Sequence, residues 1–400
     1  MVLTRLHTKE NLMNILERLD ESILLNAEEK QLLESVKDIC RDVIAPNAAQ
    51  FDESKEFPWE NIKAINELGL NAMFVPEAYG GALLSYTAYL ACVREISKAC
   101  ASTGIIWATN FHGMKPLIDF GNEEQKTRLL PRIAEGGLGS LAITEPSAGS
   151  DATGMKLSFT PDGDDIIVNG SKIFISNGDF ADLYLLFGKW SEIEGSKEAI
   201  SALVFEKGTP GFSVLGVEKK MGHRAASTAA ISFDNCRVPR ANLLMNPGDG
   251  LKILLSSLNK SRPSVAAHAL GIARAALEDG VEYINQRKQS GKKIIEFQGI
   301  QFQLADLASE LYLCENLMWS ISRLVDNGGK DFGIEASILK YRATDAAMRI
   351  TSDVVGLLGG YGYCQDYRAE RLMRDAKITQ IWEGTNQIHR QLVGRHFIQK

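Results

Sequence analysis

Residues 138–249 interrupt an otherwise helical pattern with short segments of β-branched and aromatic residues, separated by Gly, Asn, Asp and Pro. These segments lie at 141–144, 166–168, 173–176, 183–187, 202–205, 212–216 and 230–233. Asp162-Gly163-Asp164, between two of the segments, is a strong hairpin signal. Closely spaced short strands without intervening helices predict an antiparallel sheet or barrel. A Rossmann unit is not expected, because the sequence has no strand–turn–helix with G-x-G-x-x-G.

The regions on either side are patterned for helices. Apolar residues at helical spacing in 32–44, 59–68 and 85–99, and the composition of 103–117, predict an N-terminal helical domain. Long helical patterns at 262–287, 300–325 and 336–358 are followed by shorter ones at 367–377 and 386–397. Long helices joined by short loops are typical of an antiparallel bundle. We predict a mainly helical α+β protein with domains at 1–137, 138–249 and 250–400.

Composition limits the function classes. The 400 residues are 45% hydrophobic and 24% charged, as in ordinary globular proteins. A net charge of -6 argues mildly against nucleic acid or an anionic membrane as the main partner. The first twenty residues, Met1 to Asp20, resemble neither a secretory signal nor a transit peptide, and no apolar run has the length of a membrane span. The scattered cysteines and histidines predict buried thiols, no metal site and a cytoplasmic location.

The most informative short motif is the turn at 381–390, in which Glu383 stands between Trp382 and Gly384. Gly384 permits a backbone turn that other residues resist, and Thr385 or Asn386 can cap the helix that follows. Glu383 is therefore held just outside a helix start, next to apolar residues, where a carboxylate can act as a base. The alternative is that Glu383 only complements the helix dipole. The stretch by itself favours this alternative.

Three other stretches have both a structural and a functional interpretation. The strand and turn at 141–151 can present hydroxyls and amides to an anion or a heteroaromatic edge, or can be a plain surface turn. In 169–178, strand alternation places Phe174 and Ser176 on one face, where they can meet a flat ring or belong to the core. The glycines 356, 359, 360 and 362, with Tyr361 and Tyr363, indicate either a helix C-cap or a close approach to a cofactor.

Taken together, these stretches resemble the acyl-CoA dehydrogenase family, over nearly the whole chain from about Leu25 to Phe397. The resemblance is carried, in chain order, by Thr144-Glu145-Pro146 with Gly149-Ser150-Asp151, Lys172-Ile173-Phe174-Ile175-Ser176-Asn177, Lys220-Met221-Gly222-His223-Arg224, Val238-Pro239, Leu357-Leu358-Gly359-Gly360-Tyr361-Gly362, Leu372-Met373-Arg374-Asp375-Ala376-Lys377 and Glu383-Gly384-Thr385. Each motif alone is a moderate indication of the family, and the occurrence of all of them in this order is a strong one. The family fold has an N-terminal helical domain, a middle β domain and a C-terminal four-helix bundle, usually in a homotetramer.

The resemblance implies an FAD enzyme that removes two hydrogens from Cα and Cβ of an acyl-CoA thioester. Glu383 matches the family's catalytic base, which takes the α-proton while a β-hydride passes to flavin N5. The backbone amide of Glu383 and a ribityl hydroxyl are implied to hold the thioester oxygen. An electron-transfer flavoprotein is the implied electron acceptor. Short, branched and cyclic acyl groups all remain open.

The resemblance also implies roles for further residues. Leu141, Ile143 and Thr144 match positions around the flavin's pyrimidine side, Gly149 and Ser150 match positions near the pyrophosphate, and Phe174 and Ser176 match positions on the ring and near N5. The positions that hold the ADP half of FAD, partly from a neighbouring subunit, are matched by Arg287, Gln298, Gly359, Gly360, Thr385 and Gln387. Candidate substrate contacts are Ser150, Arg262, Trp382 and Gly384.

Some positions depart from the family pattern. Phe174 stands where tryptophan is common, Ser290 where phenylalanine is frequent, and Gly356 where glutamine is frequent. The last two weaken individual adenine-side assignments. His112, His223 and His389 have no predicted role.

Two alternatives to a dehydrogenase follow from the same motifs. A related flavin oxidase or monooxygenase would reoxidise its flavin with oxygen, although a monooxygenase has no use for the base in Glu383-Gly384-Thr385. A non-catalytic scaffold that binds FAD or acyl-CoA belongs to another class, and the retained base argues against it.

Overall fold

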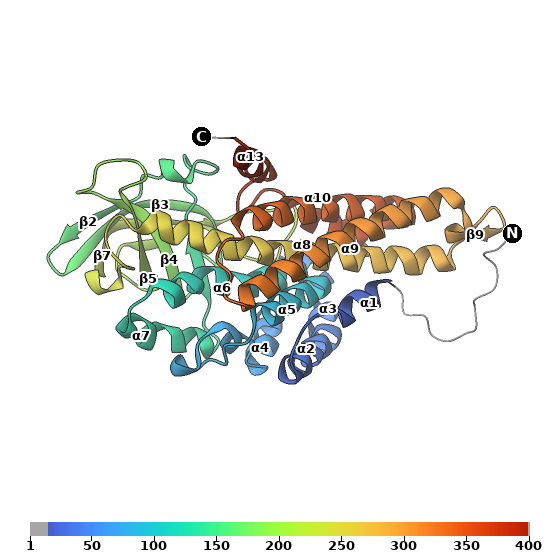
Figure 1. The fold of residues 1–400 in the computed structure, drawn as a ribbon, viewed down its shortest axis with the longest axis horizontal. Coiled ribbons are helices and arrows are strands. Elements are labelled where there is room, and N and C mark those ends of the chain that lie inside the picture. The colour runs from blue at the N-terminus through green and yellow to red at the C-terminus, as the bar shows by residue number, and fades with distance from the viewer. Residues whose placement is uncertain (1–14, 399–400) are drawn as a thin grey trace.

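The computed structural model describes residues 15–398, which form a helical part, a sheet and a second helical part in chain order (Figure 1). The first part contains α1 (Ile15–Glu21), α2 (Ala27–Ile39), α3 (Ala45–Ser54), α4 (Trp59–Glu67), α5 (Tyr86–Ala99), α6 (Ala101–Phe120) and α7 (Glu123–Ala134). Asn26 and Asn122 begin α2 and α7 with capping boxes. Pro46 lies in the first turn of α3, which continues from α2 through the π-helical turn Cys40–Ile44.

The middle part is a curled sheet of seven strands. The predicted sheet is confirmed, but it is mixed and not wholly antiparallel, and the segments predicted at 166–168 and 173–176 belong to one strand. They are β1 (Gly139–Ala142), β2 (Ser158–Asp162), β3 (Asp165–Ser176), β4 (Leu183–Trp190), β5 (Ile200–Glu206), β6 (Phe212–Val217) and β7 (Thr228–Pro239). The order is β1-β4-β2-β3-β7-β6, with β5 paired to β4. Pairings are antiparallel except those of β4 with β1 and with β2. The predicted hairpin is confirmed, since Asp162 pairs with Asp165 and Gly163 has a φ of 64°.

The last part contains α8 (Gly250–Gln286), α9 (Gln298–Asp326), α10 (Gly333–Leu358), α11 (Gly360–Tyr363), α12 (Ala369–Thr379) and α13 (Asn386–His396), with the small hairpin β8 (Lys288–Gln289) and β9 (Lys292–Lys293). The helix predicted for 262–287 begins earlier, at Gly250, and continues through Pro263. This proline deprives the Asn259 carbonyl of a helical partner. Nearly complete burial of the residues after it, 264–277, stabilises the unbroken helix. Within residues 15–398, no helix has the length and apolar character needed to cross a membrane.

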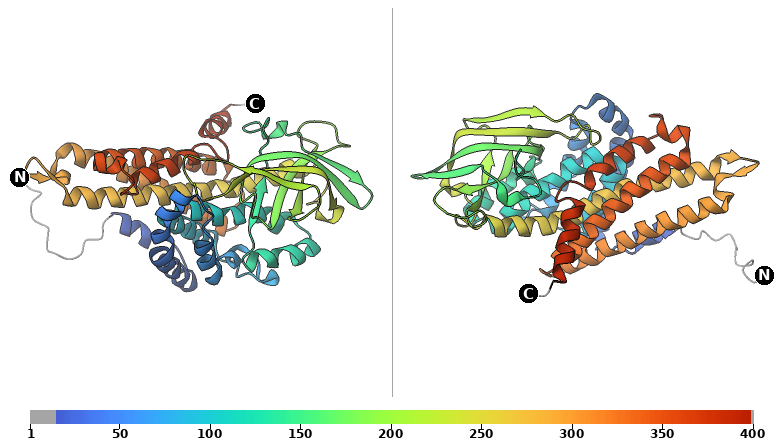
Figure 2. Two further views of the ribbon diagram at one scale, coloured as in Figure 1. Left: turned by 180° about the vertical axis from the view of Figure 1, so that it is seen from behind. Right: turned by 90° about the horizontal axis from the view of Figure 1, so that it is seen from above.

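Helix α6 joins the helical parts to the sheet. Gly113 of α6 lies so close to β1 that a Cβ there would approach the Ser140 carbonyl oxygen to 2.6 Å. The side chain of Asn110 accepts a hydrogen bond from the Gly139 N–H at 2.8 Å. The two views of Figure 2 show the sheet at one end of the molecule and the long helices extending away from it. The position of α6 beside β1 is therefore fixed by both packing and hydrogen bonds.

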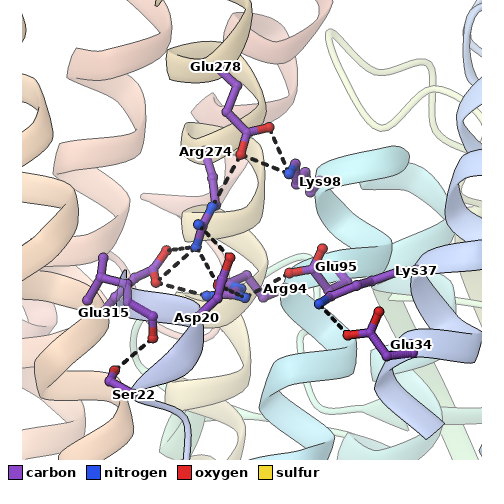
Figure 3. A network of polar contacts seen from close by, with 11 residues as sticks. Asp20, Ser22, Glu34, Lys37, Arg94, Glu95, Lys98, Arg274, Glu278 and Glu315 are labelled. Atoms are coloured by element: carbon purple, nitrogen blue, oxygen red, sulfur yellow. Dashed lines mark hydrogen bonds and ion pairs between the residues drawn. The ribbon is translucent and has the colours of Figure 1, made fainter. Parts of the chain in front are cut away.

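A buried ion network fastens α1 to the helices behind it (Figure 3). Arg94 of α5 is fully buried and pairs with Asp20 of α1 at 2.6 Å and with Glu315 of α9 at 2.9 Å. Arg274 of α8 contacts the same Asp20 at 2.8 Å. Removing one member would leave a buried charge without compensation, which costs several kcal/mol. The network therefore stabilises the packing of α1, α5, α8 and α9.

Candidate active site

The turn that carries Glu383 has a strained backbone. Glu383 has a φ of 51° and Gly384 a φ of 89°. The left-handed region is costly for a residue with a Cβ and is found at functional sites more often than elsewhere. Thr385 is the N-cap of α13 and accepts a hydrogen bond from the Ile388 N–H at 3.4 Å. The turn predicted from the sequence is present, and Thr385 forms the cap.

A buried lysine holds this turn against α10. Lys340 Nζ donates to the Gly384 carbonyl at 2.7 Å and to Asn386 Oδ1 at 3.1 Å. Asn386 also donates to Thr344 at 2.9 Å and to Asp345 at 2.8 Å. Burial lowers the pKa of Lys340 to about 7, although the nearby Glu383 carboxylate opposes the shift. These bonds fix the turn from outside the motif.

The Glu383 side chain lies between two helices and is 16% exposed. Its Oε2 accepts a hydrogen bond from Ser261 Oγ of α8 at 2.8 Å. Its Oε1 lies 4.0 Å from His112 Nδ1 of α6. Burial lowers the pKa of His112, so its imidazole is neutral at pH 7 despite the opposing effect of the carboxylate. His112, for which the sequence predicts no role, lies beside the candidate base.

Arg262 lies near Glu383 but is committed to α8 and α10. Its Nη1 donates to Asn259 Oδ1 at 2.9 Å and to Ser337 Oγ at 3.3 Å. Its Nε is buried, and none of residues 15–398 supplies a hydrogen-bond partner for it. Buried polar atoms normally have partners. Arg262 therefore supplies positive charge to the site and keeps one donor uncommitted.

Trp382 packs on two buried histidines. Its ring centroid lies 5.1 Å from that of His223 and 5.6 Å from that of His268. The two histidines meet through their Nε2 atoms at 2.7 Å, and His268 Nδ1 meets Ser97 Oγ at 2.7 Å. Asp375 accepts a hydrogen bond from the His223 N–H. This layer supports the residue that precedes Glu383.

The predicted flavin residues of the middle domain lie together at the ends of β1 and β3. The Ile173 N–H donates to the Thr144 carbonyl at 2.9 Å, and Ser140 Oγ donates to the Ser176 carbonyl at 2.7 Å. A register shift between Lys172 and Ile175 interrupts the regular alternation that we expected across Phe174 and Ser176. Phe174 has a φ of 59° at this bulge and is 59% exposed. The bulge turns the aromatic ring outward.

A buried ion pair holds the loop after β1. Lys172 Nζ donates to Glu145 Oε1 and to the Ile143 carbonyl, both at 2.8 Å. Glu145 also accepts the N–H groups of Lys156 at 2.6 Å and Leu157 at 3.0 Å. Leu141, Ile143 and Thr144 are half-buried, whereas Gly149 and Ser150 are exposed. The ion pair therefore anchors the loop after β1, and the turn at Gly149 and Ser150 is exposed.

A groove of about 500 Å³ lies at the C-terminal end of α10. It is lined by Arg287, Gly359, Gly360 and Tyr361, among others. The Arg287 guanidinium lies 5.8 Å from the Tyr361 ring centroid. Cys364, which was expected to be buried, is exposed at this groove because it follows the short α11. The groove combines an exposed cation, an aromatic ring and accessible backbone.

The structure does not bring all predicted cofactor residues together within one chain. Thr385 and Gln387 lie beside the Glu383 turn, which contacts α10 at Lys340. Gly359 and Gly360 follow Leu358 at the other end of α10, about 27 Å away along a helix axis. Arg287 shares their groove, and exposed Gln298 begins α9 close by in the chain. Two separate groups result, one near the base and one far from it.

Three residues that contact Glu383 or its turn were not predicted from the sequence. Ser261 directly precedes Arg262, and its hydroxyl would have been notable on a buried helix face. Lys340 interrupts the apolar stripe of α10 between Ala336 and Ala343, which is a detectable signal. His112 lies in an otherwise apolar helix, but only the tertiary structure shows that it faces Glu383.

The fold and the site define a protein of helical, sheet and helical parts with a strained, partly buried carboxylate between them. Family models match in the same order: the acyl-CoA dehydrogenase N-terminal domain at residues 26–137, the middle domain at 140–236 and the C-terminal domain at 248–398. An acyl-CoA dehydrogenase of Bacillus subtilis is 43% identical over 93% of this chain and 98% of its own length. The chain belongs to the acyl-CoA dehydrogenase family, a family of oxidoreductases.

Solved structures agree with this assignment. Butyryl-CoA dehydrogenase from Megasphaera elsdenii superimposes with a TM-score of 0.91 at 37% identity, covering 94% of this chain and 99% of that chain. A glutaryl-CoA dehydrogenase from Mycobacterium smegmatis, in complex with FADH2, gives a TM-score of 0.89 at 28% identity, with coverage of 96% and 98%. The predicted order of domains and the predicted family are confirmed.

Proposed function

We propose that the protein is an FAD-dependent acyl-CoA dehydrogenase that converts a short, branched or cyclic acyl-CoA into its 2-enoyl-CoA. The observation that carries the proposal is the position of Glu383. A carboxylate is held in a left-handed turn, 16% exposed, with one oxygen bonded to Ser261 and the other directed toward neutral His112. Maintaining such a conformation requires support from the surroundings, which Lys340 and Thr385 supply.

Glu383 is the base of the proposed reaction. It removes the α-proton of the thioester, and partial burial keeps competing water away from the carboxylate. Among residues 15–398, no hydrogen bond engages the backbone N–H of Glu383. This donor is available for the thioester oxygen, where it would stabilise the negative charge that develops when the α-proton leaves. One residue thus contributes both the base and an oxyanion donor.

The chain's residues fit FAD. Phe174 exposes an aromatic ring at the end of the sheet, although large aromatic side chains are usually buried. Thr144 and Ser176 lie beside it and offer hydroxyls to the ring edge. When bound there, FAD would accept the β-hydride. The Arg287 groove suits the ADP half, because guanidinium groups bind phosphate and open glycines allow close approach.

The distance between the two groups of cofactor residues favours an oligomer. Gly359 lies too far along α10 from the Glu383 turn to serve the same ring, and Arg287 shares the groove of Gly359. We therefore propose that both bind the ADP half for a neighbouring copy in a homotetramer. An electron-transfer flavoprotein is the proposed electron acceptor, and the cytoplasm the proposed location. The acyl contacts are assigned to Arg262, Trp382, Gly384 and Ser150.

Replacing the base tests the proposal. Glu383→Gln should retain yellow FAD yet lose about 10²–10⁴-fold in the rate of anaerobic flavin bleaching by acyl-CoA. Glu335→Gln, which changes an exposed carboxylate of α10, is the matched control and should bleach like the wild type. A Glu383→Gln variant that bleaches at the wild-type rate would show that the proposed mechanism is wrong.

Two further measurements define the activity. Bleaching by a panel of acyl-CoA thioesters identifies the acyl group, and the panel should include short, branched and cyclic members. Slow reoxidation of the substrate-reduced flavin in air is expected for a dehydrogenase. Rapid reoxidation would instead indicate an oxidase, and a purified protein without colour would favour a non-catalytic scaffold.

A further inference from the structure

The two oxygens of the Glu383 carboxylate have different surroundings. Oε2 accepts a hydrogen bond from Ser261 Oγ at 2.8 Å. Oε1 faces His112 Nδ1 at 4.0 Å, and no hydrogen bond engages it among residues 15–398. An oxygen whose lone pair already accepts a hydrogen bond is the weaker proton acceptor. The carboxylate is therefore asymmetric before substrate arrives.

Ser261 has a choice of acceptors. It is 1% exposed, and its single hydroxyl proton can go to Glu383 Oε2 at 2.8 Å or to the Leu258 carbonyl at 3.3 Å. The bond to an ionised carboxylate is charge-assisted and stronger. Once the carboxylate takes up a proton this advantage disappears, and the Leu258 carbonyl, one turn back in α8, becomes a competitive acceptor. Ser261 therefore donates to the Glu383 carboxylate, and not to the Leu258 carbonyl, while the carboxylate is ionised.

The other groups that face Glu383 come from every helix around it. They are Tyr89 of α5, His112 of α6, Arg262 of α8, Lys340 of α10 and His389 of α13. Burial lowers the pKa of His112 and lowers that of His389 to about 3, so both imidazoles are neutral at pH 7. Burial raises the pKa of the Tyr89 hydroxyl, which stays protonated. Lys340 donates to the turn backbone and Arg262 to Ser337. Within residues 15–398, Ser261 alone donates a hydrogen bond to the carboxylate.

We propose that Ser261 is a positioning residue that holds Oε2 of Glu383 and leaves Oε1 as the oxygen that accepts the substrate's α-proton. The inference rests on the proposed function of Glu383 as base. In the step, the Cα–H bond breaks and an O–H bond forms at Oε1. The electron pair left on Cα becomes the Cα=Cβ bond as the β-hydride leaves to the flavin. Ser261 touches neither substrate nor flavin in this step and acts through Glu383.

The pH profile of flavin reduction tests the role of Ser261. In Ser261→Ala the carboxylate loses a charge-assisted hydrogen-bond donor. The acidic limb of the pH–rate profile should therefore shift to a pH higher by about 1–2 units. The maximal rate should fall about tenfold because the carboxylate is less well oriented. Substrate affinity should stay within about twofold, since the hydroxyl is not a substrate contact. A purely structural role would lower FAD content or thermal stability and leave the acid limb in place.

Matched variants keep the test decisive. Ser257→Ala removes a buried hydroxyl of α8 that has no hydrogen-bond partner in the described part of the chain. The acidic limb of its pH profile should coincide with that of the wild type. Ser261→Thr should restore the wild-type limb, and Ser261→Val, of similar volume but without the hydroxyl, should not. The inference is wrong, and the proposed function stands, if the pH–rate profiles of Ser261→Ala and Ser261→Val coincide with that of the wild type while Glu383→Gln is inactive. If Glu383→Gln is itself active, the proposed function is wrong.

Discussion

The Glu383 turn and the Arg287 groove lie at opposite ends of α10 and are built differently. At the first, one chain supplies nearly everything: the strained backbone, the Lys340 clamp, the Ser261 hydroxyl and the histidine layer behind Trp382. At the second, Arg287, Gly359 and Gly360 are exposed, and the groove is open. The contrast indicates that the Glu383 turn is held entirely by its own chain, whereas the groove is open to whatever is placed against it.

The contrast also separates two kinds of mutational effect. Changes around the Glu383 turn should alter the rate of the chemical step while the flavin stays bound. Changes in the groove should alter flavin retention while bound flavin still reacts. Substitutions at Lys340 and Arg287 test whether effects on the chemical step and effects on flavin retention are separate in this way.

Apart from replacement of Glu383 itself, the largest effect is expected at Lys340. Lys340→Met removes the donor to the Gly384 carbonyl and Asn386, so the turn loses its buried support. A displacement of the base by about 1 Å can cost about 10²-fold in rate, and we expect a loss of that order in anaerobic flavin bleaching. FAD content should remain near that of the wild type. Lys252→Met, on the exposed face of α8, is the control. Unchanged bleaching would show that the turn needs no clamp.

A smaller effect is expected at Arg287. Arg287→Ala removes a guanidinium from the groove, and loss of a charge-assisted contact to phosphate corresponds to roughly 10–100-fold weaker FAD binding. Fluorescence titration of apoprotein with FAD measures this change. With FAD saturating, bleaching should match the wild type. Arg237→Ala, an exposed residue of β7, should bind FAD normally. Normal affinity in Arg287→Ala would place the ADP half elsewhere.

The smallest effect is the acid sensitivity of the histidine layer. Burial lowers the pKa of His268 from 6.5 to about 3, and nearby His112 adds to the shift. Between these values the unfolded chain binds more protons, so the free energy of unfolding falls as pH falls below about 6.5. His268 should contribute at most about 1.4 kcal/mol per pH unit. In His268→Gln that contribution is absent.

Denaturant unfolding between acid and neutral pH measures the difference. The slope of stability against pH should be smaller for His268→Gln than for the wild type. His396→Gln, at an exposed position of α13, should keep the wild-type slope. Parallel slopes for the wild type and His268→Gln would contradict a neutral buried imidazole.

The sequence predicted whatever depends on local pattern. The period of apolar residues distinguished helical from sheet regions, Asp162-Gly163-Asp164 located a hairpin, and Glu383-Gly384-Thr385 located a turn with a cap. Pro263 illustrates the limit: a local helix breaker is tolerated when the surrounding helix is buried. The bulge at Phe174 illustrates another, because an irregular strand looks regular in sequence.

The sequence could not predict contacts between distant segments. His112 and Ser261 belong to different helices, and only tertiary packing directs both toward the Glu383 carboxylate. The separation of Arg287 from Thr144 likewise depends on the length and direction of α8. The resemblance implied that a neighbouring subunit shares in binding the ADP half, but it did not say which residues lie near the base within one chain. Residue roles at Glu383, at the flavin face and in the groove stay predictions until they are measured.

Deuterium exchange at the substrate's α-carbon tests the role of Glu383 most directly. An acyl-CoA whose β-carbon carries no hydrogen cannot be dehydrogenated, so any reaction with the FAD-loaded protein in D2O stops at α-proton transfer. We predict that the wild type incorporates deuterium at Cα and that Glu383→Gln, with FAD still bound, does so at least about 10²-fold more slowly. Exchange by Glu383→Gln at the wild-type rate would contradict Glu383 as the base.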